Sequence, residues 1–475
     1  MLRRKPSHLS DRQATVYATP RFSADGSTLV DRRLTPAGGP VDVSGGWFDA
    51  GDYLKFTHTT SFSVIQLFLA GREMPAAKGL SAEAEHGVRW LERMWDDTSG
   101  TLYAQVGLGQ GNNDTLRGDH DLWRLPEADD AMNTRPGHPD HLIGHRPVFR
   151  ANEPGRPISP NLAGRVAAAF ALAAQADSHP AAARRWLDKA AEVYARADTS
   201  PEGPLVTAYP GAFYSEDSWQ DDLQLAAAQL ARAARQRGDT RAVEWQRQAG
   251  AWARAYLASD TKDTLGVADV SALARAEILG SPDHGGQLAG MLRADLRRQL
   301  TDATDRARQD PFGAGADYTD FDAVPRSLGL VTTALLHARL TGEHQYDAFA
   351  ARQRGWVLGA NPWGSSFVIG VGEVYPHCPA HPVANLAGSL DGTGDILHGA
   401  VVNGPNGAKV VKELKHWLET RACQADPGRP WSDFDGRGAR YLDRVSAWQT
   451  VEPAIDFTST ALLAFALSSH PPGHR

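Results

Sequence analysis

Residues 41–56 read VDVSGGWFDAGDYLKF and combine carboxylates, glycines and aromatic rings in one short stretch. Asp49 and Asp52 are three positions apart, so on a turn or the first turn of a helix their side chains point the same way. Two ionised carboxylates directed at one spot can hold a water molecule and remove its proton. Trp47 and Tyr53 offer flat ring faces beside them. The stretch predicts a water-activating site, although an Asp-x-x-Asp pattern is also typical of a simple helix cap.

The bulk composition is that of a folded globular chain. The 475 residues are 42% hydrophobic and carry a net charge of −7, with no long basic run, so nucleic acid is not an expected partner. No apolar run approaches the length that crosses a membrane, and we expect no membrane partner. The two cysteines, Cys378 and Cys423, allow one disulfide at most. The positive start at residues 1–8 has no apolar stretch after it, which leaves the cellular location open.

Helical periodicity dominates the chain after residue 56. Apolar residues recur every three or four positions, many of them alanine, and strand patterns are few. The predicted helices are 59–72, 80–95, 160–177, 180–197, 219–237, 240–258, 268–279, 284–301, 325–341, 344–358, 408–420 and 453–469.

Short and long connections alternate between these helices. The long stretches are 97–158, 198–218, 302–324 and 359–407, and long loops in a compact domain usually carry function. The pattern predicts an all-α fold, an (α/α)6 toroid or barrel of about twelve helices with the long loops on one rim. An α-solenoid is the alternative, but no fixed repeat length is visible. We expect an extended N-terminal arm over residues 1–40 and one catalytic domain over residues 41–475.

Closing such a ring makes the first and last helices neighbours. Asp49 and Asp52 precede the first helix, and residues 448–456, WQTVEPAID, precede the last. Glu452 would then lie near the two aspartates. Two carboxyl groups that meet in this way can act as a pair, with one protonated as an acid and the other ionised as a base. Because a helix N-terminus lowers a carboxyl pKa, Glu452 needs burial or nearby anions to remain protonated.

Residues 44–52 resemble the signature of glycoside hydrolase family 9, the inverting cellulases, which reads near SGGWYDAGD. The final family signature, near NEVAIDYN, resembles residues 451–457, VEPAIDF, with Val451 and Phe457 as departures. The resemblance implies that Asp52 is the base, Asp49 its partner in holding the water, and Glu452 the acid.

Further motifs are similar to loops that line the family's substrate cleft. Residues 356–368, WVLGANPWGSSFV, and 397–406 follow the family order, and residues 375–382, YPHCPAHP, resemble a loop that grips sugar hydroxyls. The resemblance and the ring-rich loops suggest that His120, Trp123, Tyr214, His377 and His381 bind substrate, together with Trp47 and Tyr53. The run His-Cys-x-x-His also suggests a metal, but three clustered ligands do not make a structural zinc site.

Residues 219–223, WQDDL, resemble a family segment whose acids help to bind a structural calcium. Asp217, Asp221, Asp222 and Asp269 could supply its hard oxygen ligands. A capping cluster is the alternative interpretation of these acids.

The resemblance implies an inverting β-1,4-glucan hydrolase that cuts within chains, whose partner is a β-glucan and whose chemistry needs no cofactor. Two alternatives stay open: an exo-acting β-glucosidase or β-glucosaminidase on oligosaccharides, and a glycan-binding toroid without catalysis. A sugar epimerase of the same fold would need paired histidines on inner helices, and the histidines here fall mostly in loops.

Overall fold

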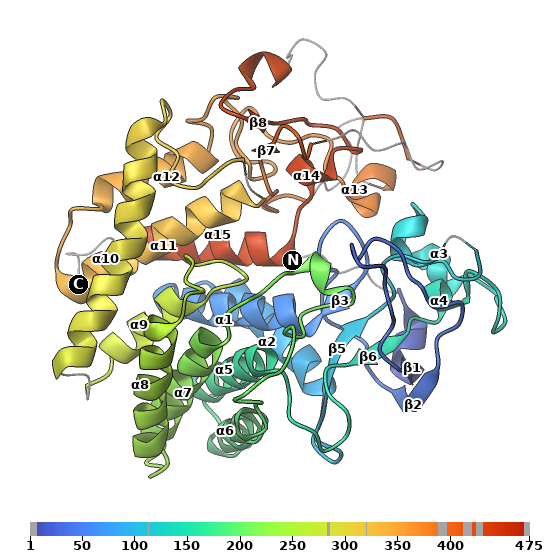
Figure 1. The fold of residues 1–475 in the computed structure, drawn as a ribbon, viewed down its shortest axis with the longest axis horizontal. Helices are drawn as coiled ribbons and strands as arrows, with labels where there is room; N and C mark the ends of the chain where they lie inside the picture. Colours follow the sequence, from blue (N-terminus) through green and yellow to red (C-terminus); the bar gives the residue numbers. More distant parts are fainter. Residues whose placement is uncertain are drawn as a thin grey trace.

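Six helices in the described part of the chain lie side by side in a closed ring. The computed structural model describes residues 7–112, 114–282, 286–319, 321–387, 397–411, 420–423 and 431–469 (Figure 1). Each ring helix packs against the next in chain order, and the last packs against the first. The ring helices are α1 (Thr57–Glu73), α5 (Pro160–Ala176), α7 (Gln220–Arg235), α9 (Ser271–Leu279), α11 (Ala323–Thr341) and α15 (Ile455–Ser468).

Each of the first five ring helices is followed by an outer helix that packs on it. The outer helices are α2 (Lys78–Arg93), α6 (Pro180–Ala195), α8 (Ala242–Ala258), α10 (Gly286–Gln309) and α12 (Asp347–Val357). The predicted (α/α)6 toroid is therefore confirmed. Of the predicted helix at 408–420, residues 412–419 lie outside the described residues.

The long loops all lead into the N-terminal ends of ring helices, so they gather on one rim. Short connections such as 74–77 and 177–179 join ring helices to outer helices at the opposite rim. Helix α10 continues to Gln309, so the predicted loop at 302–324 is shorter than expected and covers residues 310–322.

A small sheet, which the sequence did not predict, joins the N-terminal arm to the loop rim; Figure 1 shows it to one side of the helices. The strand order is β2-β1-β6-β5-β3, with β4 on β5, and only β1 and β6 run parallel. Strand β3 continues directly into α1. The strands are β1 (Ala14–Tyr17), β2 (Pro36–Val41), β3 (Lys55–Phe56), β4 (Trp95–Asp96), β5 (Thr101–Val106) and β6 (Val148–Arg150).

Short elements complete the loop rim. They are the helices α3 (Glu127–Asp130), α4 (His141–Gly144), α13 (Pro382–Leu386) and α14 (Trp448–Val451), the 3-10 turns Leu9–Gln13, Asp119–Asp121, Gly211–Phe213 and Trp431–Phe434, and the paired strands β7 (Asn406–Gly407) and β8 (Ala439–Arg440). A disulfide joins Cys378 to Cys423, so Cys378 is not available as a metal ligand. Among the described helices, none is both long and apolar enough to cross a membrane.

A buried ion cluster fastens the arm to the start of α1. The Asp11 carboxylate accepts hydrogen bonds from Lys55 Nζ (2.9 Å) and Arg146 Nε (3.0 Å), and Arg146 also donates to the Tyr53 carbonyl. Although burial raises it, the two cationic neighbours hold the pKa of Asp11 well below its usual range. The arm is thus part of the packed structure, while its division from the catalytic domain at residue 41 stays a prediction.

The cluster predicts a large effect for Asp11→Asn. Asparagine carries no charge, so Lys55 and Arg146 would remain buried without a counter-ion, and breaking a buried pair in this way costs about 3–5 kcal/mol. We expect that loss in the free energy of unfolding measured with urea at pH 7. The control is Asp114→Asn, which removes the partner of Arg32 in an ion pair whose side chains are 72% and 59% exposed. A stability change equally small in both variants would contradict the buried cluster.

Candidate active site

Ring closure brings the two distant motifs into contact. Glu452 Oε1 accepts a hydrogen bond from the backbone N–H of Gly51 (3.0 Å), between Asp49 and Asp52. The Asp49 carbonyl accepts the backbone N–H of Ile455, the first residue of α15 (2.9 Å). Only glycine fits at position 51, because a Cβ there would lie 2.3 Å from the Ala380 carbonyl oxygen and 2.7 Å from Glu452 Oε1.

Asp49 is the deepest carboxyl of the group. It is 2% exposed, and its two oxygens accept hydrogen bonds from the Thr59 and Tyr214 hydroxyls. Burial and then the charge of Asp52 raise the pKa of Asp49 to about 7, against the effect of both hydroxyls. This carboxyl is therefore close to its protonation midpoint at neutral pH.

Asp52 is more accessible, with 13% of its side chain exposed. Its Oδ1 accepts the Leu54 backbone N–H (2.8 Å), and its Oδ2 lies 2.8 Å from His120 Nε2. Burial lowers the pKa of His120, but the hydrogen bond with Asp52 and the nearby carboxylates outweigh it and raise the pKa to about 9. At neutral pH the His120 imidazolium therefore donates to the Asp52 carboxylate.

Glu452 has the electrostatics of a general acid. It lies between α14 and α15, outside both helices, so no helix N-terminus holds it ionised. Burial and then the charge of Asp52 raise its pKa to about 8, although the Gly51 N–H lowers it. Burial and neighbouring carboxyl groups, which a protonated Glu452 needs, are thus both present.

A fourth carboxyl, Asp456, was not identified from the sequence as a site residue. It is 2% exposed on the first turn of α15, and its Oδ1 has no hydrogen-bond partner among the described residues. Burial and then the charge of Asp49 raise the pKa of Asp456 well above its usual range. The only sequence signal was its place in the motif of residues 451–457.

Asp49, Asp52, Glu452 and Asp456 form the carboxyl cluster, and two of the predicted substrate-binding residues contact it. His120 contacts Asp52, and Tyr214 contacts Asp49. His377 is exposed on the rim, where its ring stacks on Tyr375 at a centroid distance of 4.6 Å. These three side chains can reach a ligand.

The other four predicted substrate-binding residues are buried, and their assignment is corrected. Trp47 and Tyr53 are 0% exposed; Trp47 Nε1 donates to Glu83, and the Tyr53 hydroxyl donates to the Arg124 carbonyl. Trp123 Nε1 donates to Asn385 Oδ1. His381 is 1% exposed, and burial lowers its pKa to about 3. These side chains are packed in the interior and present no free face to a ligand.

The predicted calcium ligands do not form a metal cage. Asp217 is exposed, while Asp221, Asp222 and Asp269 are buried and already accept hydrogen bonds from protein groups. The Asp222 partner is the guanidinium of Arg165. Among the described residues, no group of three or more His, Cys, Asp or Glu side chains is arranged to hold a metal ion. The residues present therefore do not fit calcium.

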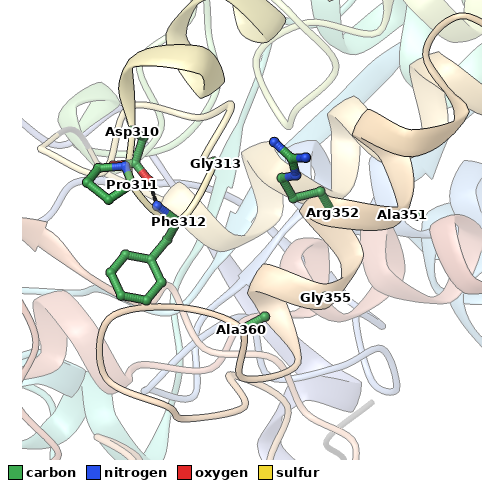
Figure 2. A pocket seen from close by; sticks show the side chains of 8 residues that line it. All are labelled: Asp310, Pro311, Phe312, Gly313, Ala351, Arg352, Gly355 and Ala360. Atoms are coloured by element: carbon green, nitrogen blue, oxygen red, sulfur yellow. Dashed lines mark hydrogen bonds between the residues drawn. The ribbon is translucent and has the colours of Figure 1, made fainter.

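Two cavities lie away from the carboxyl cluster. One, of about 540 Å³, is lined by the loop after α10 and the end of α12, with Phe312 and Arg352 among its side chains (Figure 2). The other, of about 470 Å³, lies near the C-terminal ends of ring helices and is lined by residues including Arg72 and Glu277. Neither contains a carboxyl group of the site, so the chemistry is assigned to neither.

Comparisons with known proteins find similar sequences over most of the chain. The sequence model described as glycosyl hydrolase family 9 matches residues 1–465. Endoglucanase 14 of Arabidopsis thaliana is 27% identical over 416 residues, which are 77% of this chain and 78% of that protein. Endoglucanase B of Cellulomonas fimi is 27% identical over 399 residues, which are 77% of this chain and 34% of that protein.

Solved structures share the fold. A family 9 endoglucanase called J30 has a TM-score of 0.68 at 22% identity, covering 98% of this chain and 79% of its own. The structure of AaCel9A in complex with cellobiose-like isofagomine has a TM-score of 0.67 at 23% identity. The match covers 96% of this chain and 81% of that one.

The raised pKa of Glu452 predicts a stability gain for Glu452→Gln. Between the ordinary value of 4.5 and about 8, the folded chain keeps a proton on Glu452 that the unfolded chain has lost, so this group lowers stability as pH rises. Glutamine keeps the hydrogen-bond acceptor but does not titrate. We expect the thermal midpoint of the variant to exceed that of the unmodified chain at pH 8, with little difference near pH 4.5.

The control for this comparison is Glu244→Gln on the outer helix α8, where the carboxylate pairs with Arg247 at the surface. Its midpoint should follow that of the unmodified chain from pH 5 to 8. If the thermal midpoints of Glu452→Gln and of the unmodified chain changed with pH in parallel, Glu452 would titrate normally and the prediction would be contradicted.

Proposed function

The chain belongs to glycosyl hydrolase family 9, and we propose that it cleaves β-1,4-linked glucan chains at internal bonds with inversion at the anomeric carbon. The observation that carries the proposal is the contact of Glu452 with the backbone between Asp49 and Asp52. It brings Glu452, which holds its proton at neutral pH, next to Asp52, which accepts hydrogen bonds from the Leu54 backbone and from His120. Inverting hydrolysis requires this division of roles between two carboxyl groups.

In the proposed reaction Glu452 is the general acid. It gives its proton to the glycosidic oxygen as the bond from that oxygen to the anomeric carbon breaks. Water attacks the anomeric carbon from the opposite face, and Asp52 takes a proton from that water. The cycle leaves Glu452 ionised and Asp52 protonated, and solvent restores both. The protein supplies both proton-transfer groups, so this chemistry requires no cofactor.

Asp49 is proposed as the second group that holds the water. It is deeper than Asp52, and the Thr59 and Tyr214 hydroxyls fix its orientation. A fixed carboxyl beside the base can accept the second hydrogen of the attacking water and so set its direction of attack. The greater exposure of Asp52 supports its assignment as the base.

The substrate assignment rests on the site's accessible groups and on the family. His120 and Tyr214 lie at the carboxyl cluster, and His377 with Tyr375 lies on the same loop rim. Such side chains can donate hydrogen bonds to sugar hydroxyls and offer ring faces to their apolar sides. Relatives covering more than three quarters of both chains carry the name endoglucanase, which supports internal cleavage.

Hydrolysis of cellohexaose tests the proposal. Internal cleavage produces several short oligosaccharides at once, and inversion of a β-linkage makes the α-anomer appear first in proton NMR spectra. Release of glucose alone would mean an exo-acting glycosidase, and a bound but uncleaved substrate would mean a binding protein; either result contradicts the proposal. We expect Asp52→Asn and Glu452→Gln each to lower kcat about 100- to 10,000-fold. Glu244→Gln, on the outer helix α8, is the matched control and should retain full activity.

The hydroxyl of Tyr214 predicts a separate effect. Tyr214→Phe keeps the ring packed on Phe56 and His58 but removes the hydrogen bond to Asp49. A hydrogen bond to a charged group contributes about 1.5–3 kcal/mol, so we expect kcat to fall about 10- to 100-fold. The pKa of Asp49 should rise further, because the lost hydroxyl lowers it. An unchanged kcat on cellohexaose, with an unchanged pH profile, would exclude this role.

A further inference from the structure

An arginine lies at the centre of the acidic group that the sequence suggested as a calcium site. Arg165, on the ring helix α5, is 0% exposed. Its Nε donates to Asp222 Oδ1 (2.7 Å), and its Nη2 donates to Glu216 Oε1. Its Nη1 donates to the Val267 carbonyl and lies 2.9 Å from His58 Nε2. The guanidinium thus contacts acceptors on every side.

Most of the remaining acidic oxygens are also used by the protein; Asp222 Oδ2 is the exception, buried without a hydrogen-bond partner among the described residues. Asp221 accepts hydrogen bonds from Ser218 Oγ (2.5 Å) and the Val270 backbone N–H (2.7 Å). Asp269 accepts them from the Tyr256 hydroxyl and the backbone N–H of Ser271 (2.9 Å). A calcium ion, which takes six to eight oxygens, would have to displace these donors together with the guanidinium.

We propose that Arg165 is a built-in cation that takes the place of a structural calcium ion, so that the folded chain does not depend on calcium. A guanidinium is permanently charged and presents five N–H donors in a planar fork, so one residue can neutralise two carboxylates and satisfy a carbonyl. Gly164 permits this geometry, because a Cβ at that position would lie 2.6 Å from the Asp222 carbonyl carbon. Gly164 therefore lets α5 approach α7 closely, and the guanidinium of Arg165 places a positive charge between the two helices.

The cation joins segments that meet at the active-site rim. Its partners come from the start of α7, the loops before α7 and α9, and the start of α1. Glu216 is two residues from Tyr214, which contacts Asp49, and His58 is adjacent to Thr59, which also contacts Asp49. Arg165 therefore stabilises the same loop region that a metal ion between these acids would stabilise.

Removal and addition of calcium test the proposal on the unmodified chain. The thermal midpoint is measured after treatment with EDTA and then during titration with calcium chloride, with magnesium chloride as the ion control. A ligand that binds only the folded state raises the midpoint as its concentration rises above the dissociation constant. We expect no shift on chelation or on calcium addition. A midpoint that falls with EDTA and recovers specifically with calcium would overturn the proposal.

A pair of variants tests the charge itself. Arg165→Met leaves Asp222 and Glu216 without their cation, and we expect a marked fall in the midpoint. Adding Asp222→Asn removes one of the unpaired anions, so the double variant should be more stable than Arg165→Met alone. A double variant that loses the sum of both single effects would overturn the cation role. If Arg165→Met does not fold, the chelation result on the unmodified chain decides alone.

The matched control is Asp217→Asn, which changes the exposed member of the predicted calcium set. Asp217 is exposed on the loop before α7 and is not a partner of Arg165 in the structure. The thermal midpoint of the Asp217→Asn variant, with and without calcium, should equal that of the unmodified chain. A calcium response that disappears in this variant would mean that a metal ion binds there and would overturn the proposal.

Discussion

The hydrogen bond from the Gly51 backbone to Glu452 joins positions 401 residues apart, and the site exists because the ring of helices makes that contact possible. Helices α1 and α15 pack side by side, with Ser63 and Ser459 within 3.2 Å of each other. Their N-terminal ends therefore face the same rim, and the residues just before each helix meet there. The charge of Asp52, which together with burial raises the pKa of Glu452, acts on it because of this proximity.

The chain contains two kinds of buried charge, which differ in their partners. At Asp11 and Arg165, opposite charges meet with well-placed donors, and the cations hold the pKa values of Asp11 and Glu216 below their usual range, although burial raises that of Asp222. These clusters connect loops to the helical ring. At the active site, Asp49, Glu452 and Asp456 are gathered without a matching number of cations, and their pKa values rise. Functional sites commonly keep such unfavourable arrangements because shifted pKa values serve proton transfer, while the surrounding structure supplies the stability.

Much of the fold could be predicted from the sequence because long amphipathic helices have a strong periodic signal. Helices α1, α5, α7 and α15 lie within a few residues of their predicted bounds. The sheet was missed because its strands are short, and β2, read as PAGGPV, has no strand pattern. Trp47 and Tyr53 were assigned to substrate because a ring's position in a motif does not reveal which side of the backbone it packs on. Arg165 was missed because its partners come from four other segments, which only the folded chain brings together.

The order of the two motifs along the chain affects when the site can form during synthesis. Gly51, with the aspartates on either side of it, leaves the ribosome 401 residues before Glu452. Until Glu452 has emerged, the nascent chain has the proposed base without the proposed acid. The site forms only when α15 docks against α1, so turnover would report that the ring of helices has closed.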